Sequence, residues 1–207
     1  MSSVIFLVDH SAGKISKAAG ELATYAKSIG ESVAVIFADN ADSITSQLNA
    51  FQVDRVITVA GEWDKYGAPA IAEGLAQIVA AKNPAAVLIT STATGKEIAA
   101  RVSVLTGSGI ITDAVNVDKD LITTQSVFGG STTVHSTVTK GVPVITLRAN
   151  SIEAVAATSN PAVETFTATI SDAAKLAPIS SATPVVKGGR PDLTEASIVV
   201  SGGRGTN

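Results

Sequence analysis

The sequence predicts an α/β fold in three layers, in which helices cover both faces of a mostly parallel sheet. Apolar residues make up 45% of the 207 residues but aromatic residues only 4%, which is typical of β-branched strands buried on both faces. Short apolar runs alternate four times with segments of helical periodicity between residues 4 and 106. Such alternation predicts parallel strands that are joined by right-handed helical crossovers.

The elements of this first half follow one another with ordinary boundary signals. Gly30 and Gly107 stand where two helices would end, and Pro69 falls in the first turn of another, where a helix tolerates proline. We expect strands at 4–9, 32–38, 54–60 and 85–91, and helices at 14–29, 41–50, 67–82 and 95–106.

The pattern changes from about residue 110, where helical periodicity is lost. Short β-branched runs lie at 121–128, 131–139 and 142–148, and residues 128–131 (FGGS) have the composition of a turn. We therefore expect antiparallel strands added to the C-terminal side of the sheet. The alternating run 163–170 is a candidate edge strand.

A Pro- and Gly-rich stretch at 178–192 reads as a linker. We expect a first domain at 1–190. Residues 191–207 would then be linker followed by the first strand, at 196–201, and the Gly-rich turn of a second domain. A helix normally follows such a turn, so we expect the functional module to continue beyond it.

Composition excludes several classes of function. The net charge is −3 and no stretch concentrates basic residues, so nucleic acid is not an expected partner. There are no cysteines for disulfides, iron–sulfur clusters or thiolate metal sites, so redox chemistry would need a bound organic cofactor. The apolar runs are too short for membrane insertion, and the N-terminus has no leader pattern, so we expect a cytoplasmic protein.

The loop at 91–96 (STATGK) lies between a predicted strand and helix, where anions often bind. It departs from the P-loop pattern, because Thr90 replaces the first glycine and Glu97 stands where Ser or Thr would hold Mg²⁺. A plain helix start capped by Thr92 or Thr94 is the better interpretation.

Four further side chains are candidates with ordinary alternatives. His10 and His135 lie in different segments, and a surface or loop role is expected for each in place of metal binding or catalysis. Arg101 and Arg148 each end an apolar stretch. A salt bridge on a helix face or at a strand end is expected for them, and a subunit or cofactor interface is the alternative.

The terminal residues Ser201, Gly202, Gly203 and Arg204 are the strongest candidates for chemistry. Glycine lets backbone N–H groups approach an anion, and a guanidinium donates charge-assisted hydrogen bonds to a phosphate or to a reduced, anionic flavin. Gly-Gly turns are also common in linkers, so the turn alone leaves both interpretations open.

Taken together, these segments resemble the alpha subunit of electron transfer flavoproteins in its bacterial form. The resemblance rests on five ordered blocks: STATGKEIAAR (91–101), TGSG (106–109) followed by TDA (112–114), FGG (128–130), PVITLR (143–148), and PDLTEAS (191–197) followed by VVSGGRG (199–205).

This resemblance implies an alpha/beta heterodimer that carries electrons on FAD and is itself no enzyme. Acyl-CoA dehydrogenases of fatty acid beta-oxidation, or other dehydrogenases, would reduce it, and a membrane quinone oxidoreductase would reoxidise it. The N-terminal domain would have a Rossmann-like fold of the adenine nucleotide alpha hydrolase-like type and would pack against the beta subunit. The following domain would hold FAD. By match to that domain's opening motif, Arg204 would contact the flavin, and Ser201, Gly202 and Gly203 would shape its turn.

The chain lacks the domain-sized C-terminal segment of that family, so we expect these 207 residues alone to bind FAD weakly or not at all. The chief alternative is a free-standing adenine-nucleotide-binding protein similar to universal stress proteins. A docking module without a ligand is a third possibility.

Overall fold

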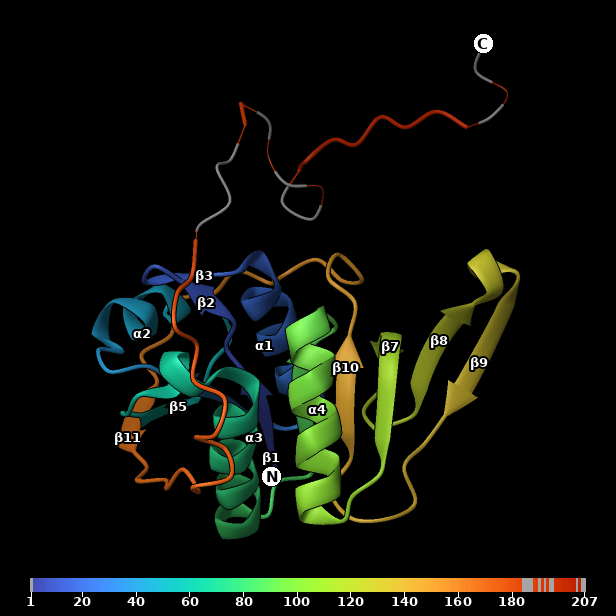
Figure 1. The fold of residues 1–207 in the computed structure, drawn as a ribbon. Coiled ribbons are helices and arrows are strands. Elements are labelled where there is room, and N and C mark those ends of the chain that lie inside the picture. Colours follow the sequence, from blue (N-terminus) through green and yellow to red (C-terminus); the bar gives the residue numbers. More distant parts are fainter. Residues whose placement is uncertain are drawn as a thin grey trace.

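The computed structural model describes residues 2–183, 188, 189, 191, 193, 196–203 and 205. A nine-stranded sheet in the order β11-β5-β4-β1-β6-β10-β7-β8-β9 forms its centre (Figure 1). All neighbouring strands pair in parallel except β8, which is antiparallel to both β7 and β9. The strands are β1 (Ser3–Leu7), β4 (Glu31–Phe37), β5 (Arg55–Val59), β6 (Ala86–Thr90), β7 (Ile110–Val117), β8 (Thr123–Val127), β9 (Thr132–Ser136), β10 (Val144–Leu147) and β11 (Ala162–Thr165).

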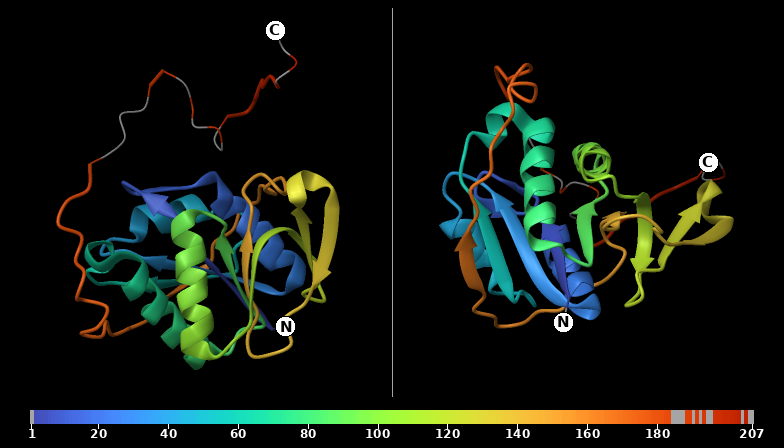
Figure 2. Two further views of the ribbon diagram at one scale, coloured as in Figure 1. Left: turned by 45° about the vertical axis from the view of Figure 1, so that its right-hand side comes forward. Right: turned by 90° about the horizontal axis from the view of Figure 1, so that it is seen from below.

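The central strands are apolar throughout because both of their faces are buried. In β1, Val4 and Phe6 belong to one core and Ile5 to the other, as the two-residue period of a strand requires. Helices α1 (Lys17–Ile29) and α2 (Asp42–Leu48) cover the first core, and α3 (Trp63–Lys82) and α4 (Ala93–Thr106) cover the second (Figure 2). The predicted three-layer α/β fold is confirmed.

Two helix starts differ from the sequence prediction. The segment before α1 forms a small hairpin of β2 (His10–Ser11) and β3 (Lys14–Ile15), so the helix begins at Lys17. Helix α3 is interrupted at Gly67, whose φ of 60° and ψ of −143° are not helical. The longer part of α3 therefore begins beyond Gly67, and Pro69 lies in its first turn as predicted.

The second half of the sheet contains the largest correction. The run 142–148 was expected as an added antiparallel strand, but β10 is parallel and lies between β6 and β7. Its four residues are all buried, which is the position that a wholly apolar strand favours. Strand β7 was not predicted, because Asp113 and Asn116 interrupt its apolar residues and no two-residue period results.

Other expectations for this half are confirmed. Strands β8 and β9 form an antiparallel hairpin, and the turn between them is a short 3₁₀ segment at Phe128–Gly130. Strand β11 (Ala162–Thr165) pairs with β5 at one edge of the sheet, as expected for the run 163–170, but residues 166–170 of that run are not part of the strand.

The expected strand at 196–201 is absent, since none of these residues belongs to a helix or strand. Ile198 and Val200 are 84% and 94% exposed. A strand forms only where a neighbour completes its hydrogen bonds, and the described part of the chain offers this segment no such neighbour. None of the helices in the described part is long and apolar enough to cross a membrane.

Candidate functional site

The carboxyl ends of β1 and β6 form the natural position for a site. The chain runs from β1 to β4 and β5 on one side, and then crosses back to β6 on the other side of β1. Such a reversal of strand order leaves a crevice beyond the carboxyl ends of the two strands, where ligands of open α/β sheets bind.

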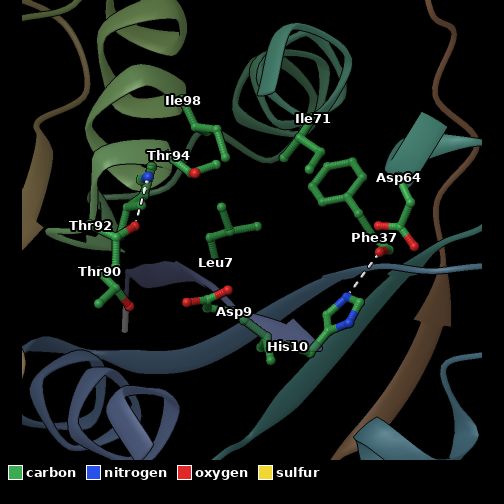
Figure 3. Close-up of a pocket in the computed structure, with 13 residues that line it drawn as sticks. Leu7, Asp9, His10, Phe37, Asp64, Ile71, Thr90, Thr92, Thr94 and Ile98 are labelled. Atoms are coloured by element: carbon green, nitrogen blue, oxygen red, sulfur yellow. Dashed lines mark hydrogen bonds between the residues drawn. The ribbon is translucent and has the colours of Figure 1, made fainter. Parts of the chain in front are cut away.

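A cavity of about 110 Å³ lies at this crevice (Figure 3). Leu7 and Asp9 approach it from the end of β1, Thr90 and Thr92 from the end of β6, and Ile71 from α3. Its volume is below the roughly 300 Å³ at which pockets for small-molecule ligands begin. The cavity alone is therefore smaller than a typical ligand pocket.

The same edge of the sheet is acidic. Asp9 and Asp64 line the crevice, and an adjoining cavity of about 460 Å³ is lined by Asp39, Glu62 and again Asp64. Burial raises the pKa of Asp9 above its ordinary value, and His10 acts in the opposite direction. Lys65, the lysine beside the second cavity, donates to Glu62 at 2.9 Å. This edge disfavours phosphates, which weakens the alternative of an adenine-nucleotide-binding protein.

Helix α4 begins at the crevice with an ordinary cap. The Thr92 hydroxyl accepts the N–H of Gly95 at 2.9 Å, as predicted for a capped helix. A Cβ on residue 95 would lie 2.0 Å from the carbonyl oxygen of Thr90. Gly95 is thus needed for the close approach of α4 to β6, which explains the glycine without a bound phosphate.

Lys96, the candidate phosphate-binding lysine of the loop, is already paired. Its Nζ lies 2.9 Å from Oδ2 of Asp113, whose Oδ1 accepts the hydroxyl of Ser91 at 2.7 Å. Arg148 lies 3.9 Å from Oδ1 of the same carboxylate and donates to the carbonyl of Ser126 at 3.1 Å. One aspartate thus joins β6, α4, β7 and the end of β10.

The backbone conformation and a backbone hydrogen bond of Asp113 fix its position, in addition to its ion pairs. Its φ is 58°, and its N–H donates to the hydroxyl of Thr146 at 3.0 Å. Burial by itself would raise the pKa of Asp113, but hydrogen bonds from Lys96 and Ser91 and the charges of Lys96 and Arg148 lower it below its ordinary value. Asp113 is therefore an ionised anchor for two cations.

The ordinary interpretation of both arginines is confirmed. Arg101 pairs with Glu97 one helical turn earlier at 2.8 Å, and Arg148 lies beside Asp113 at a strand end. The two histidines have local hydrogen-bonding partners, since His10 Nε2 lies 3.1 Å from the Phe37 carbonyl and His135 Nδ1 lies 3.3 Å from the Thr124 hydroxyl. Within the described ranges, no group of three or more His, Cys, Asp or Glu side chains could hold a metal ion.

The predicted flavin-binding residues lie apart from this crevice in sequence. Ser201, Gly202 and Gly203 are exposed and belong to no helix or strand. Arg204 lies outside the described residues. The cofactor-binding role of these four residues stays a prediction.

Asp113 is the polar residue that the sequence analysis missed. It belongs to the TDA block (112–114) of the family resemblance, and the sequence predicted no role for it. An acidic residue within a β-branched run (IITDAV, 110–115) was the available signal, since a carboxylate beside the buried strands of a sheet favours charged or hydrogen-bonding partners.

Fold and site together define a Rossmann-like α/β domain whose carboxyl edge carries acidic residues and whose loop lysine is internally neutralised. A family model described as "Electron transfer flavoprotein domain" matches residues 4–171. The chain belongs to this electron transfer flavoprotein family.

Several curated relatives carry the name electron transfer flavoprotein subunit alpha. That of Mycobacterium leprae is 36% identical over 208 residues, which cover 99% of this chain and 65% of the relative. That of Mycobacterium tuberculosis is 38% identical over 157 residues, covering 74% and 49% of the two chains. That of Syntrophomonas wolfei is 29% identical, covering 99% and 66%. The chain thus spans about two thirds of the length of the relatives that it matches throughout.

Proposed function

We propose that this chain is the N-terminal part of an electron transfer flavoprotein alpha subunit, which is an electron carrier and no enzyme in its own right. The family match over residues 4–171 is the observation that carries the proposal. In this proposal, FAD in an alpha/beta heterodimer accepts electrons from acyl-CoA dehydrogenases of beta-oxidation or from other dehydrogenases. A membrane quinone oxidoreductase then reoxidises the flavin, and the carrier acts in the cytoplasm.

Residues 1–190 are, in this proposal, the scaffold that packs against the beta subunit. The acidic side chains around the two cavities and the neutralised Lys96 support a role without a nucleotide of its own. The family match also lies wholly within this unit, which supports a boundary near 190.

Residues 191–207 are proposed to open the FAD domain. Arg204 would donate charge-assisted hydrogen bonds to the flavin, and Ser201, Gly202 and Gly203 would let the backbone approach it. The chemical reason is that a reduced flavin is anionic, so a fixed guanidinium stabilises the reduced form more than the oxidised form. FAD would bind weakly or not at all to the 207 residues alone, because most of its contacts would lie beyond them.

The test is to express the complete alpha subunit with its beta subunit and to titrate the apoprotein with FAD. We expect a yellow heterodimer in which Arg204→Ala weakens FAD binding about tenfold, the effect of a charged hydrogen bond of about 1.4 kcal/mol, and lowers the flavin reduction potential. Arg101→Ala is the matched control, because its guanidinium pairs with Glu97 on the surface of α4.

Two results would contradict the proposal in different ways. A complete subunit that pairs with a beta subunit but never holds flavin would refute the electron-carrier function. An Arg204→Ala heterodimer with unchanged FAD affinity and potential would refute only the role of Arg204.

A further inference from the structure

The adjoining cavity of about 460 Å³ (the acidic cavity) lies where the loops after two parallel strands meet. Asp39 follows β4 and Gly61 follows β5, and the N–H of Gly61 donates to Oδ1 of Asp39 at 3.1 Å. Ala12 and Gly13, in the turn of the β2–β3 hairpin, also line this cavity. Its volume lies within the roughly 300–1,000 Å³ of small-molecule sites, and ligands of open α/β sheets bind at this end of the strands. The acidic cavity therefore has the size and the position of a ligand site.

The side chains around the acidic cavity leave it with negative charge. Among the described residues that line it, Asp39, Glu62 and Asp64 are carboxylates, and Lys65 is the lysine. Lys65 donates to Glu62 at 2.9 Å, so that these two charges offset each other. The carboxylate of Asp64, which also lines the smaller cavity (Figure 3), has no hydrogen-bonding or ionic partner within the described ranges. With His10 neutral, the two negative charges of Asp39 and Asp64 remain, and they attract cations.

The indole N–H of Trp63 is a donor in the wall of the acidic cavity that lacks an acceptor. Trp63 is 1% exposed, and its Nε1 is buried without a hydrogen-bonding partner in the part of the chain that the structure describes. An indole nitrogen can only donate, and most buried donors have an acceptor. A Cβ on Gly61 would lie 2.9 Å from this nitrogen, so the absence of a side chain there leaves the N–H uncovered on the side of the cavity that Gly61 lines. The donor therefore favours a ligand with a hydrogen-bond acceptor.

We propose that the acidic cavity binds a small organic cation that carries a hydrogen-bond acceptor close to its ammonium or guanidinium group. The carboxylates of Asp39 and Asp64 would bind the cationic group, and the N–H of Trp63 would donate to the acceptor. A metal ion is not the expected occupant, since no group of three or more His, Cys, Asp or Glu side chains among the described residues could hold one. The inference goes beyond the proposed function, because the site requires neither flavin nor a second subunit.

Trp63 makes such binding directly observable, because it is the single tryptophan of the chain. In the protein labelled with the heavy nitrogen isotope, its indole gives one N–H resonance by NMR. L-Argininamide is the probe, since it carries a guanidinium, an ammonium and a carbonyl acceptor. L-Citrullinamide is the matched control probe, since an uncharged urea replaces the guanidinium. At constant ionic strength we expect argininamide to move the indole proton resonance downfield to saturation and to bind about fivefold more tightly than citrullinamide, the effect of one exposed ion pair.

Variants of the two carboxylates test the charge of the site. Asp64→Asn removes one charge at nearly constant size, so we expect the affinity for argininamide to fall about fivefold. The double variant Asp39→Asn, Asp64→Asn keeps an acceptor for the N–H of Gly61, and we expect a fall of about twentyfold. Asp120→Asn, in the exposed turn between β7 and β8, is the matched control and should leave the affinity within about twofold. Thermal unfolding checks that each variant folds, and the titration of the wild-type protein with both probes remains decisive if one does not.

Several results would overturn the inference. An indole resonance that moves with neither probe, or equally with both, would show that the cavity does not recognise an organic cation. Unchanged affinity in the double variant would exclude the two carboxylates. An acetylated peptide amide with a central arginine that binds at least about tenfold more tightly than argininamide would assign the cavity to a side chain of a protein partner. Because none of these measurements involves FAD or the beta subunit, a negative result leaves the proposed function intact, and failure of the proposed function leaves this inference intact.

Discussion

Glu21 is a carboxylate that the fold buries without full compensation. It lies in α1 with 4% of its surface exposed. One oxygen, Oε2, accepts the N–H of Asn150 at 2.8 Å, whereas Oε1 is buried without a partner. Burial raises the pKa of Glu21, and the Asn150 hydrogen bond and the charge of Lys17 oppose this rise only in part. The ionised form is thus less stable in the folded protein than in the unfolded chain.

The sign of the resulting pH dependence follows from the raised pKa. Below the pKa of the unfolded chain Glu21 is protonated in both states and has no cost, whereas above the folded pKa its full cost is present. Glu21→Gln keeps an acceptor for Asn150 and removes the charge. We therefore expect a free energy of unfolding about 1 kcal/mol higher than wild type at pH 8, and no difference near pH 4. Urea unfolding at both pH values measures this, and a variant less stable at pH 8 would contradict it.

At the scale of single elements, the start of α4 is set by contact with a strand. Thr92 caps the helix, and the absence of a side chain at Gly95 lets the helix approach the end of β6. The end of α4 differs, because Gly107 adopts a left-handed φ of 63° and a Cβ there would contact nothing within 4 Å. Helix α4 thus contains one glycine that packing requires, and it is followed by one that the left-handed backbone conformation favours.

These two glycines make a direct comparison. In Gly95→Ala the new methyl group forces the backbone to move, and such overpacking costs about 3 kcal/mol. The higher helix propensity of alanine offsets about 1 kcal/mol of this cost. We therefore expect the free energy of unfolding to fall by about 2 kcal/mol. In Gly107→Ala the only cost is that of placing an alanine in the left-handed backbone conformation, so we expect the free energy of unfolding to fall by about 1 kcal/mol. Chemical denaturation of both variants tests the order. A Gly95→Ala protein as stable as Gly107→Ala would show that the approach of α4 to β6 relaxes easily.

At the scale of the whole molecule, both cores are complete before the C-terminal region. The buried apolar residues run from Val4 to Ala174, and beyond them the Ile179 N–H donates to the Lys65 carbonyl at 2.8 Å. The two cores and the strands and helices that form them thus lie within residues 1–183.

Truncation after residue 183 should therefore leave the free energy of unfolding within about 0.5 kcal/mol of the 207-residue chain, with the same dependence on urea concentration. Equilibrium unfolding of both chains measures this. A loss of several kcal/mol on truncation would mean that residues beyond 183 belong to the first unit, and the boundary near 190 would then be wrong.

The sequence by itself determined the features that arise from neighbouring residues. Apolar periodicity gave the four strand–helix repeats of residues 4–106, the Thr92 cap, and the helix ends at Gly30 and Gly107, because local hydrogen bonds and the burial of one helix face act over a few residues. The ordered blocks indicated the family. The flavin-binding role of Arg204 stays a prediction, because that residue lies outside the described part of the chain.

Only the tertiary structure decided which distant segments meet. An apolar run such as 144–147 is compatible with either strand direction, and its insertion between β6 and β7 depends on pairing across more than twenty residues of chain. The pairing of Asp113 with Lys96, and the position of β9 at one edge of the sheet, follow from the same long-range order. The physical reason is that periodicity encodes which face of a strand is buried, whereas the neighbour and direction of a strand are selected by the packing of the whole sheet.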